Sequence, residues 1–461
     1  MTVGEDDPTT QAAPERVPPP SRHASWREWF RLVVALVLVS VGAGAFAMTF
    51  RWTLQVVYRS LLGGHDVLEA FTRLPMAARL AVPAFGGMLA GSVARIAIRT
   101  SGQGVGDVME AVVVGRTRLS LRSTAWKALG SWFAIATGNS IGREGPLIQF
   151  GGSLGSTVAA MMSISGRSAR ALIAAGTAAG FAAAYNTPLA AVLFVLEIVT
   201  GVVAIDALVM VMVATGIATA LVRASVGGGP IYGQRSFSVA TTSELLAHAG
   251  LGVVAAVCAH VFMRMLATGE RLFDRRYLPQ PWRATLGGLL VGALALVLPQ
   301  VTGNGYEPLN RLLDGQYSLS LVAVLLLAKA LATTASVGSG SPGGVFTPSL
   351  LIGGAVGMLW GYVVGPLVGA PGSEASFALV GMAAFTAATT HAPLMASVLV
   401  FELSGDYAIV LPLVLATALA TSVSRRLGHD SIYTAELSRR GIRWNVTLEG
   451  RDFGSRERET D

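Results

Sequence analysis

One carboxylate lies in sequence that otherwise suits a membrane. Glu144 stands in the string Gly-Asn-Ser-Ile-Gly-Arg-Glu-Gly-Pro at residues 138–146, and apolar sequence flanks this string for tens of residues. An ionisable side chain at membrane depth costs about 2.5–3.5 kcal/mol on insertion scales, so such a residue is a candidate functional group. The glycines and the proline break the helix and expose backbone N–H groups, which attract anions. The string therefore predicts an anion site that carries its own competing carboxylate.

The same pattern of helix breaks recurs 202 residues later in the chain. Lys127 and Lys329 are the only lysines, and they occupy equivalent places in the two copies. The other matched residues are Gly138 with Gly340, Gly142 with Gly344, Pro146 with Pro348, and, at an offset of 205, Gly176 with Gly381, Pro188 with Pro393 and Glu197 with Glu402. Such repeats are typical of transporter folds built from two related halves. We therefore expect half-helix N-termini from both repeats to converge on one anion site.

The composition indicates the element type that must position this site. Of 461 residues, 52% are hydrophobic and only 13% are charged, against about 25% charged in soluble domains. Long apolar runs recur, at 32–48, 245–266, 286–298 and 319–332 among others. The sequence predicts an all-α polytopic membrane protein. The net charge of +7 does not indicate nucleic-acid binding, because the arginines cluster in flanks and loops.

The distribution of arginines also predicts the topology. Arginines precede the first apolar run and follow the last one, which places both termini in the cytoplasm of a multi-pass plasma-membrane protein. We expect a disordered cytoplasmic tail at 1–24, a membrane domain at 25–440 with repeat halves at about 28–226 and 245–430, and a short cytoplasmic tail at 441–461. That division leaves no room for an appended regulatory domain.

Several other function classes lack the residues that they need. The single cysteine, Cys258, excludes disulfides within the chain and thiolate metal clusters, and the six histidines are scattered. We therefore expect neither a metal nor a cofactor. A membrane-embedded enzyme using Glu144 is a remote alternative, because no nucleophile with its base or paired carboxylate accompanies that residue. A scaffolding protein would not need matched helix breaks in both halves.

Three strings, in this order and spacing, resemble the CLC family of chloride channels and proton/chloride antiporters in its prokaryotic form without CBS domains. They are Gly-Arg-Glu-Gly-Pro at 142–146, Gly-Gly-Val-Phe-Thr-Pro at 343–348 and Gly-His-Asp-Ser-Ile-Tyr at 428–433. The resemblance covers roughly residues 30–440. It implies an inverted repeat of two halves with tilted and broken helices. It also implies a homodimer in the lipid bilayer with one anion pathway per subunit.

The resemblance also implies roles for individual residues. Glu144 matches the gating glutamate, whose carboxylate occupies the anion path and leaves it when protonated. Val345 and Phe346 match the residues whose N–H groups hold the central anion. Arg143 and Gly145, with Glu144 between them, would offer N–H groups to an outer site. Finally, Tyr433 matches the tyrosine whose hydroxyl closes the inner side of the path.

The chain departs from the family pattern at two places. The family segment Gly-Ser-Gly-Ile-Pro is replaced at 102–106 by Gly-Gln-Gly-Val-Gly, so Gln103 and Gly104 stand where an anion-facing serine and its neighbour are expected. Chloride remains our first choice of substrate, with fluoride and nitrate as alternatives. Ile198 stands where exchangers of the family usually carry an inner glutamate for protons. Passive anion conduction and proton-coupled exchange therefore both stay open.

Structural roles compete with the functional ones at several residues. The structural alternative for Glu144 is a carboxylate that caps a broken helix, and that for Tyr433 is an interfacial tyrosine. The glycine-rich setting and repeat position of Glu144 favour the functional role, and the accompanying motifs favour it for Tyr433. Glu197 and Glu402 occupy equivalent repeat positions, so we expect a symmetric structural role for them, with backbone donors as partners near a subunit interface. The two lysines, Lys127 and Lys329, are expected to snorkel or to bind nearby carbonyls.

Overall fold

The computed structural model describes residues 26–98, 104–113, 115, 119–201, 205–233, 241–274, 278–428, 430–439, 442–447 and 450–455. The predicted tail at 1–24 and the candidate residue Gln103 lie outside them. The first half contains α1 (Trp26–Ser60), α2 (Val67–Arg73), α3 (Met76–Ile98), α4 (Val105–Val113), α5 (Leu121–Ala136), α6 (Glu144–Met161), α7 (Gly166–Tyr185), α8 (Pro188–Phe194), the π-helical η1 (Val195–Thr200) and α9 (Ile205–Val226).

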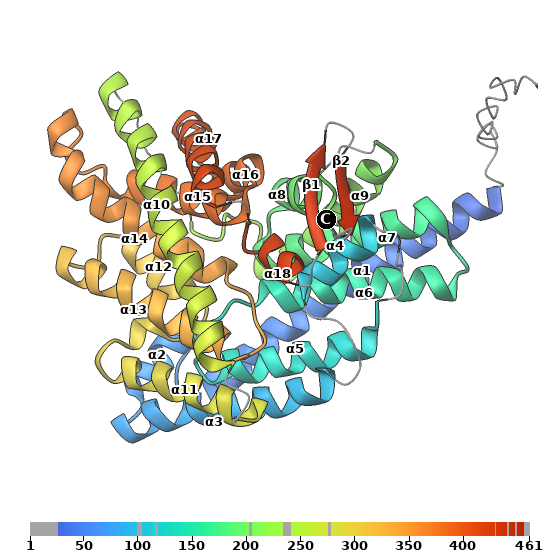
Figure 1. The fold of residues 1–461 in the computed structure, drawn as a ribbon, viewed down its shortest axis with the longest axis horizontal. Helices are drawn as coiled ribbons and strands as arrows, with labels where there is room; N and C mark the ends of the chain where they lie inside the picture. The colour runs from blue at the N-terminus through green and yellow to red at the C-terminus, as the bar shows by residue number, and fades with distance from the viewer. Residues whose placement is uncertain are drawn as a thin grey trace, which may run out of the picture.

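The second half follows the same plan. It contains α10 (Thr242–Phe273), α11 (Gln280–Val297), η2 (Pro299–Val301), α12 (Tyr306–Leu313), α13 (Leu319–Gly338), α14 (Phe346–Val364), η3 (Pro366–Val368), α15 (Glu374–Thr390), α16 (Pro393–Ser404) and α17 (Val410–Leu427). Figure 1 shows most helices of the two halves as two groups, with α3 of the first half beside α11 of the second. The prediction of an all-α polytopic fold built from two halves is confirmed.

The end of the described chain adds an element that we did not predict. The short helix α18 (Thr434–Arg439) is followed by an antiparallel hairpin of β1 (Ile442–Thr447) and β2 (Gly450–Ser455). Within the described residues, named strands are confined to this hairpin. It falls in the segment that we expected to be a short cytoplasmic tail.

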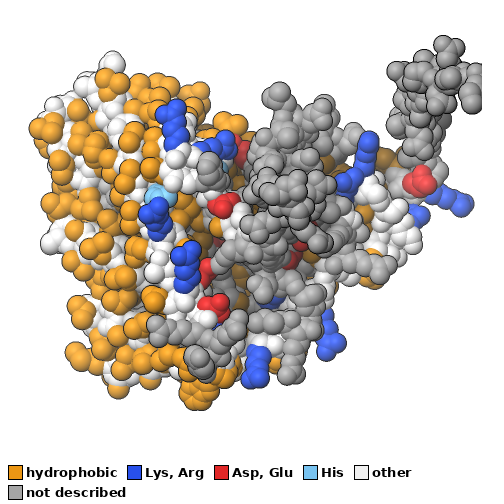
Figure 2. Space-filling model, viewed as in Figure 1, with side chains coloured by type: hydrophobic (Ala, Val, Ile, Leu, Met, Phe, Trp, Pro, Cys, Tyr) orange, Lys and Arg blue, Asp and Glu red, His pale blue; other side chains and the backbone are white. Residues whose placement is uncertain are grey.

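The outer surface of the helices suits lipid. Seven helices in the described ranges are long and apolar enough to cross a membrane: α1, α3, α9, α10, α13, α14 and α17. Figure 2 shows hydrophobic side chains spread over the part of the surface formed by the second half. Exposed apolar residues on two of its helices include Val253, Val257 and Val261 of α10 and Val324, Leu327 and Leu331 of α13. This chain is a multi-pass membrane protein.

Small residues let the two halves approach closely. Gly87 and Gly91 of α3 face α11, where a Cβ on Gly87 would lie 2.1 Å from the carbonyl oxygen of Ala284. Reciprocally, a Cβ on Gly288 of α11 would lie 2.0 Å from the carbonyl oxygen of Pro83. Membrane helices pack in this way because small residues allow backbones to touch where the hydrophobic effect gives no drive. The two matched helices thus form a close contact between the repeats.

A second reciprocal contact joins α8 and α16. The carboxylate of Glu402 accepts the N–H groups of Leu189 and Ala190 at 3.1 and 2.8 Å, at the start of α8. The carboxylate of Glu197 accepts those of Leu394 and Met395 at 3.1 and 2.6 Å, at the start of α16. Each glutamate therefore caps the helix of the other repeat. The expectation of symmetric roles with backbone donors is confirmed.

The buried lysine Lys329 holds the loop that precedes α12. Its ammonium donates to the carbonyl oxygens of Val301 and Gly303 at 2.9 and 2.8 Å. The Gly303 N–H in turn donates at 3.0 Å to the carbonyl of Gly138, the first residue of the string that contains Glu144. The expectation that this lysine binds carbonyls is confirmed. Through Gly303, its contacts also support the segment at Gly138 that leads to Glu144.

We expect Lys329→Met to lower the thermal stability of the purified protein. The change removes two hydrogen bonds from a fully buried ammonium, each contributing about 1.5–3 kcal/mol because one partner is charged. The equivalent Lys127→Met should cost less, because the Lys127 ammonium lies 3.9 Å from the Asp107 carboxylate in a partly exposed setting. Thermal unfolding followed by fluorescence in detergent checks this order. Equal losses in the two variants would contradict it.

Candidate functional site

The two helix-breaking strings meet through their backbones. The Gly142 N–H donates to the Gly344 carbonyl at 2.7 Å, and the Gly344 N–H donates to the Gly142 carbonyl at 2.9 Å. These glycines are equivalent in the two repeats, so the bridge lies on the pseudo-symmetry axis that relates them. The predicted convergence of half-helix N-termini is confirmed, because α6 and α14 each begin two residues after this bridge.

Both helices begin with backbone N–H groups that have no acceptor within their own helix. Pro146 and Pro348 occupy the third position of α6 and α14, where proline is tolerated because first-turn N–H groups have no intrahelical acceptor. The partial positive charge of a helix N-terminus adds to those donors. Glu144 and Phe346 are equivalent first residues of the two helices, so the carboxylate of one repeat starts directly beside the donors of the other.

The Glu144 side chain occupies the donor cluster at the start of α14. Its Oε1 accepts the N–H groups of Phe346 at 2.8 Å and Thr347 at 3.3 Å, and its Oε2 accepts the Thr347 hydroxyl at 3.0 Å. The side chain is 1% exposed. Hydrogen bonds to a charged group contribute about 1.5–3 kcal/mol each. A buried carboxylate is thus held where a small anion would find the same donors, and we call these donors the α14 cradle.

The two bridging glycines leave the room that this carboxylate fills. A Cβ on Gly142 would lie 2.1 Å from Glu144 Oε2, and a Cβ on Gly344 would lie 2.2 Å from Oε1. The nearest atoms to either added Cβ all belong to the Glu144 side chain. The glycines therefore shape a space that only this side chain occupies, and any larger residue would enter the α14 cradle.

Thr347 and Tyr185 belong to the site although the sequence analysis did not single them out. The Tyr185 hydroxyl, at the end of α7, lies 2.8 Å from Thr347 Oγ1. Thr347 belongs to the Gly-Gly-Val-Phe-Thr-Pro string at 343–348, but the resemblance assigned roles only to Val345 and Phe346 of that string. Nothing in the sequence around Tyr185 marked it, because it lies 162 residues away and meets the site only through the fold.

Aromatic rings connect the α14 cradle to Tyr433. The Phe346 ring packs 5.6 Å from Phe181, which stacks on Phe194 at 4.7 Å, and Phe194 meets the Tyr433 ring edge-on at 5.9 Å. Tyr433 precedes α18 and lies within electrostatic reach of Glu144. The structure thus places this tyrosine on the same side-chain cluster as the α14 cradle.

The remaining candidates lie around the two helix starts. Arg143 donates from its guanidinium to the carbonyl of Ala184 at 3.3 Å. Gly145 follows Glu144 in α6, and Val345 is the residue just before α14. Gly104 precedes α4, which packs on α6, α7 and η1, and its φ of +114° is one that glycine adopts without strain.

The described residues contain no group of three or more His, Cys, Asp or Glu side chains able to hold a metal.

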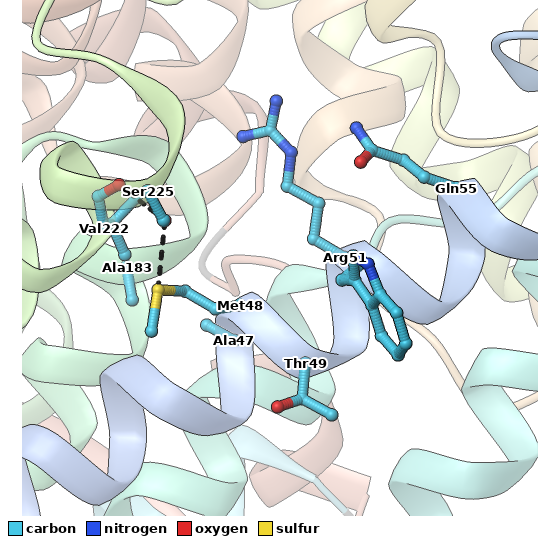
Figure 3. Close-up of a pocket in the computed structure, with 9 residues that line it drawn as sticks. Ala47, Met48, Thr49, Arg51, Gln55, Ala183, Val222 and Ser225 are labelled. Atoms are coloured by element: carbon cyan, nitrogen blue, oxygen red, sulfur yellow. Dashed lines mark hydrogen bonds between the residues drawn. The ribbon is translucent and has the colours of Figure 1, made fainter.

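A pocket of about 430 Å³ lies near this site, between α1, α7 and α9. Figure 3 shows the polar ends of the Arg51 and Gln55 side chains on the same side of α1, while the Ser225 hydroxyl contacts the Met48 sulfur at 3.1 Å. The pocket also includes Ala183, close to the Ala184 carbonyl that binds Arg143. Arg51 and Arg143 lie within electrostatic reach of each other, so a second cation lies near the residue that precedes α6.

Comparison with known proteins places this fold and site in a family. The model of the family described as "Voltage gated chloride channel" matches residues 85–425. A "Putative chloride channel protein ClcB-like" of Ralstonia nicotianae is 40% identical over 405 residues, which cover 86% of this chain and 94% of that protein. The "Voltage-gated ClC-type chloride channel ClcB" of Citrobacter koseri is 34% identical, over 88% of this chain and 98% of its own.

Solved structures agree with this assignment. The structure of "a slow cyanobacterial Cl-/H+ antiporter" superposes with a TM-score of 0.80 at 27% identity, covering 89% of this chain and 98% of that one. The family match, the full-length relatives and the inverted repeat with its paired glycines lead to one conclusion. The chain belongs to the CLC family of voltage-gated chloride channels and transporters, whose members move anions across membranes.

Proposed function

We propose that this protein carries chloride along a path through the α14 cradle, and that the Glu144 carboxylate is the gate of that path. One observation carries the proposal: a carboxylate oxygen of the protein itself accepts the N–H groups of Phe346 and Thr347, which have no acceptor within α14. A chloride ion needs the same donors, so the two compete for one place. Protonation removes the charge of the carboxylate and with it the advantage over chloride.

The chemistry of the cradle suits transport better than tight binding. Conduction needs a site that is favourable enough to enter and weak enough to leave. Backbone N–H groups and a hydroxyl are neutral donors, and the guanidinium of Arg143, next to Glu144 in the chain, donates to the Ala184 carbonyl. We propose that Val345, Gly145 and Arg143 contribute backbone N–H groups along the same path, and that the Tyr433 hydroxyl closes its inner end.

Substitution of Gln103 tests which anion the path prefers. This residue stands where the family has a serine, whose hydroxyl is smaller and carries no amide oxygen. We expect Gln103→Ser to shift relative permeability toward chloride over nitrate and fluoride. Competition of each anion with labelled chloride in vesicles measures this series. An unchanged series would place the determinant of selectivity elsewhere in the path.

Reconstitution in liposomes tests the proposed function itself. Chloride-loaded vesicles are opened to a low-chloride medium while a chloride electrode and a pH electrode record outside. Chloride efflux supports the proposal, and its absence with every tested anion contradicts it. Efflux that drives protons uphill establishes exchange, and a group other than Ile198, which is buried and apolar, must then deliver the protons. Efflux without proton movement establishes passive conduction.

We also propose that the protein is a homodimer in the bacterial inner membrane with both termini in the cytoplasm. The faces of α8 and α16 near Glu402 and Glu197 favour a dimer, because Leu189 and Leu394 are about half exposed beside carboxylates that lipid would not solvate. A second subunit covering this surface would remove those carboxylates from lipid. The division into a membrane domain at 25–440 with two flanking tails stays a prediction.

A further inference from the structure

A chain of two hydroxyls ends on the proposed gate. Tyr185 Oη lies 2.8 Å from Thr347 Oγ1, and the Thr347 hydroxyl lies 3.0 Å from Glu144 Oε2. Both residues are buried, with 5% of Tyr185 and 3% of Thr347 exposed. Tyr185 comes from α7 and Thr347 from α14, so the chain reaches Glu144 from two elements other than its own helix.

Counting protons fixes the direction of these hydrogen bonds. An ionised carboxylate is only an acceptor, so the Thr347 hydroxyl must donate its single proton to Glu144. Thr347 Oγ1 can then only accept, and the Tyr185 hydroxyl must donate to it. Hydrogen bonds in such a series polarise one another and strengthen in a low-dielectric interior. The series therefore favours the ionised, docked form of Glu144 over the protonated form, which offers no charge to the chain.

We propose that Thr347 and Tyr185 form a hydroxyl latch that holds the Glu144 carboxylate in the α14 cradle and sets the pH at which the gate opens. This inference rests on the proposed gating function of Glu144. A group that stabilises the ionised gate delays its protonation, so the latch lowers the pH needed for opening. Without the latch, the gate opens at a higher pH.

Apart from Glu307, the charged and titratable groups near Glu144 keep their state over the relevant range. Tyr185, Tyr433 and Tyr232 are within its electrostatic reach, and Arg143 precedes it in the chain. Tyrosine and arginine ordinarily titrate at about 10 and above 12. The first turn of α14 carries no charged side chain. Glu307 acts on Arg143 and on Tyr232, both near Glu144, and its variant supplies a separate control.

The test is the pH profile of chloride flux in liposomes for wild type, Thr347→Val, Thr347→Ser and Tyr185→Phe. We expect Thr347→Val to move the midpoint of the profile to higher pH by about one unit or more, the shift that loss of one hydrogen bond to a charged group gives. Tyr185→Phe should shift it in the same direction by less, because it leaves Thr347 in place. Thr347→Ser keeps a hydroxyl and should restore the wild-type midpoint.

Matched controls separate the latch from general damage. Thr177→Val removes a buried hydroxyl that bonds only within α7, and Tyr58→Phe removes a buried hydroxyl that binds the Ile135 carbonyl. Neither should move the midpoint. If Thr347→Val does not fold, Tyr185→Phe still tests the latch, because it leaves every direct contact of Glu144 in place.

Repeating Thr347→Val in the Glu144→Gln background separates the proposed hydroxyl latch from the proposed Glu144 gate. A shift that is present with Glu144 and absent without it supports the latch. Profiles of Thr347→Val and Tyr185→Phe that superpose on wild type overturn the latch, while the gate stands as long as Glu144→Gln loses its pH dependence. A shift that persists in the Glu144→Gln background also overturns it, because the hydroxyls would then act on another group.

Discussion

Chloride flux through Glu144→Gln should continue and should lose most of its pH dependence. Glutamine keeps the shape of the side chain but carries no charge, so it competes weakly with chloride for the N–H groups of Phe346 and Thr347. A gate opened by one proton changes its open fraction by up to about tenfold per pH unit. The wild-type flux should follow such a slope over part of its range, and the variant flux should stay flat. Any proton coupling should vanish with the carboxyl group.

Glu307→Gln is the control for this prediction. Burial raises the pKa of the Glu307 carboxyl above its ordinary value, and Glu307 acts on Arg143 beside the gate. It is therefore the second acid near the site that could report pH. We expect its variant to keep the wild-type pH profile. If Glu307→Gln had a flat profile and Glu144→Gln kept the wild-type profile, Glu307 and not Glu144 would be the residue that responds to pH.

Gly344→Ala should strongly reduce flux at every pH. The added methyl group would lie 2.2 Å from the position of Glu144 Oε1, so it displaces the carboxylate and also fills the place where chloride would bind. Overpacking of this kind costs about 1–3 kcal/mol, which corresponds to roughly a fivefold to 150-fold loss of anion occupancy. The Gly344 φ is not positive, so alanine is compatible with the backbone, and we expect the protein to fold.

The double variant Glu144→Gln with Gly344→Ala separates blockage from gating. Removing the charge opens the gate but leaves the methyl group in the α14 cradle, so flux should remain low. Gly216→Ala serves as the control, because an added Cβ there meets no atom within 4 Å. If the double variant conducted as well as Glu144→Gln alone, the anion path would not pass between Gly344 and Phe346.

Much of this fold could be predicted from the repeat in the sequence. The 202-residue offset pairs Gly142 with Gly344, and these two residues form the bridge at the centre of the structure. The equivalence of Glu197 and Glu402 indicated a shared role, which the structure shows as reciprocal capping. Such features are predictable because a repeat imposes the same local backbone twice, and glycine and proline mark where that backbone breaks.

The residues that were missed depend on contacts between distant segments. Thr347 and Tyr185 are 162 residues apart, and neither type is unusual in an apolar helix. Their hydroxyls come together only because the fold brings the end of α7 to the start of α14. The hairpin at 442–455 was missed for a different reason. Its first strand alternates Ile442, Trp444 and Val446 with polar residues, but its second strand is rich in glycine and charge and has little strand propensity, so the segment was interpreted as a charged tail.

The most direct measurement is a pair of crystal structures grown in bromide at neutral pH, one of wild type and one of Glu144→Gln. Bromide replaces chloride and is located by its anomalous scattering. The account predicts a bromide ion on the N–H groups of Phe346 and Thr347 in the variant, and the Glu144 carboxylate at that place in wild type. A bromide ion on these donors beside a docked carboxylate in wild type, or none there in the variant, would contradict it.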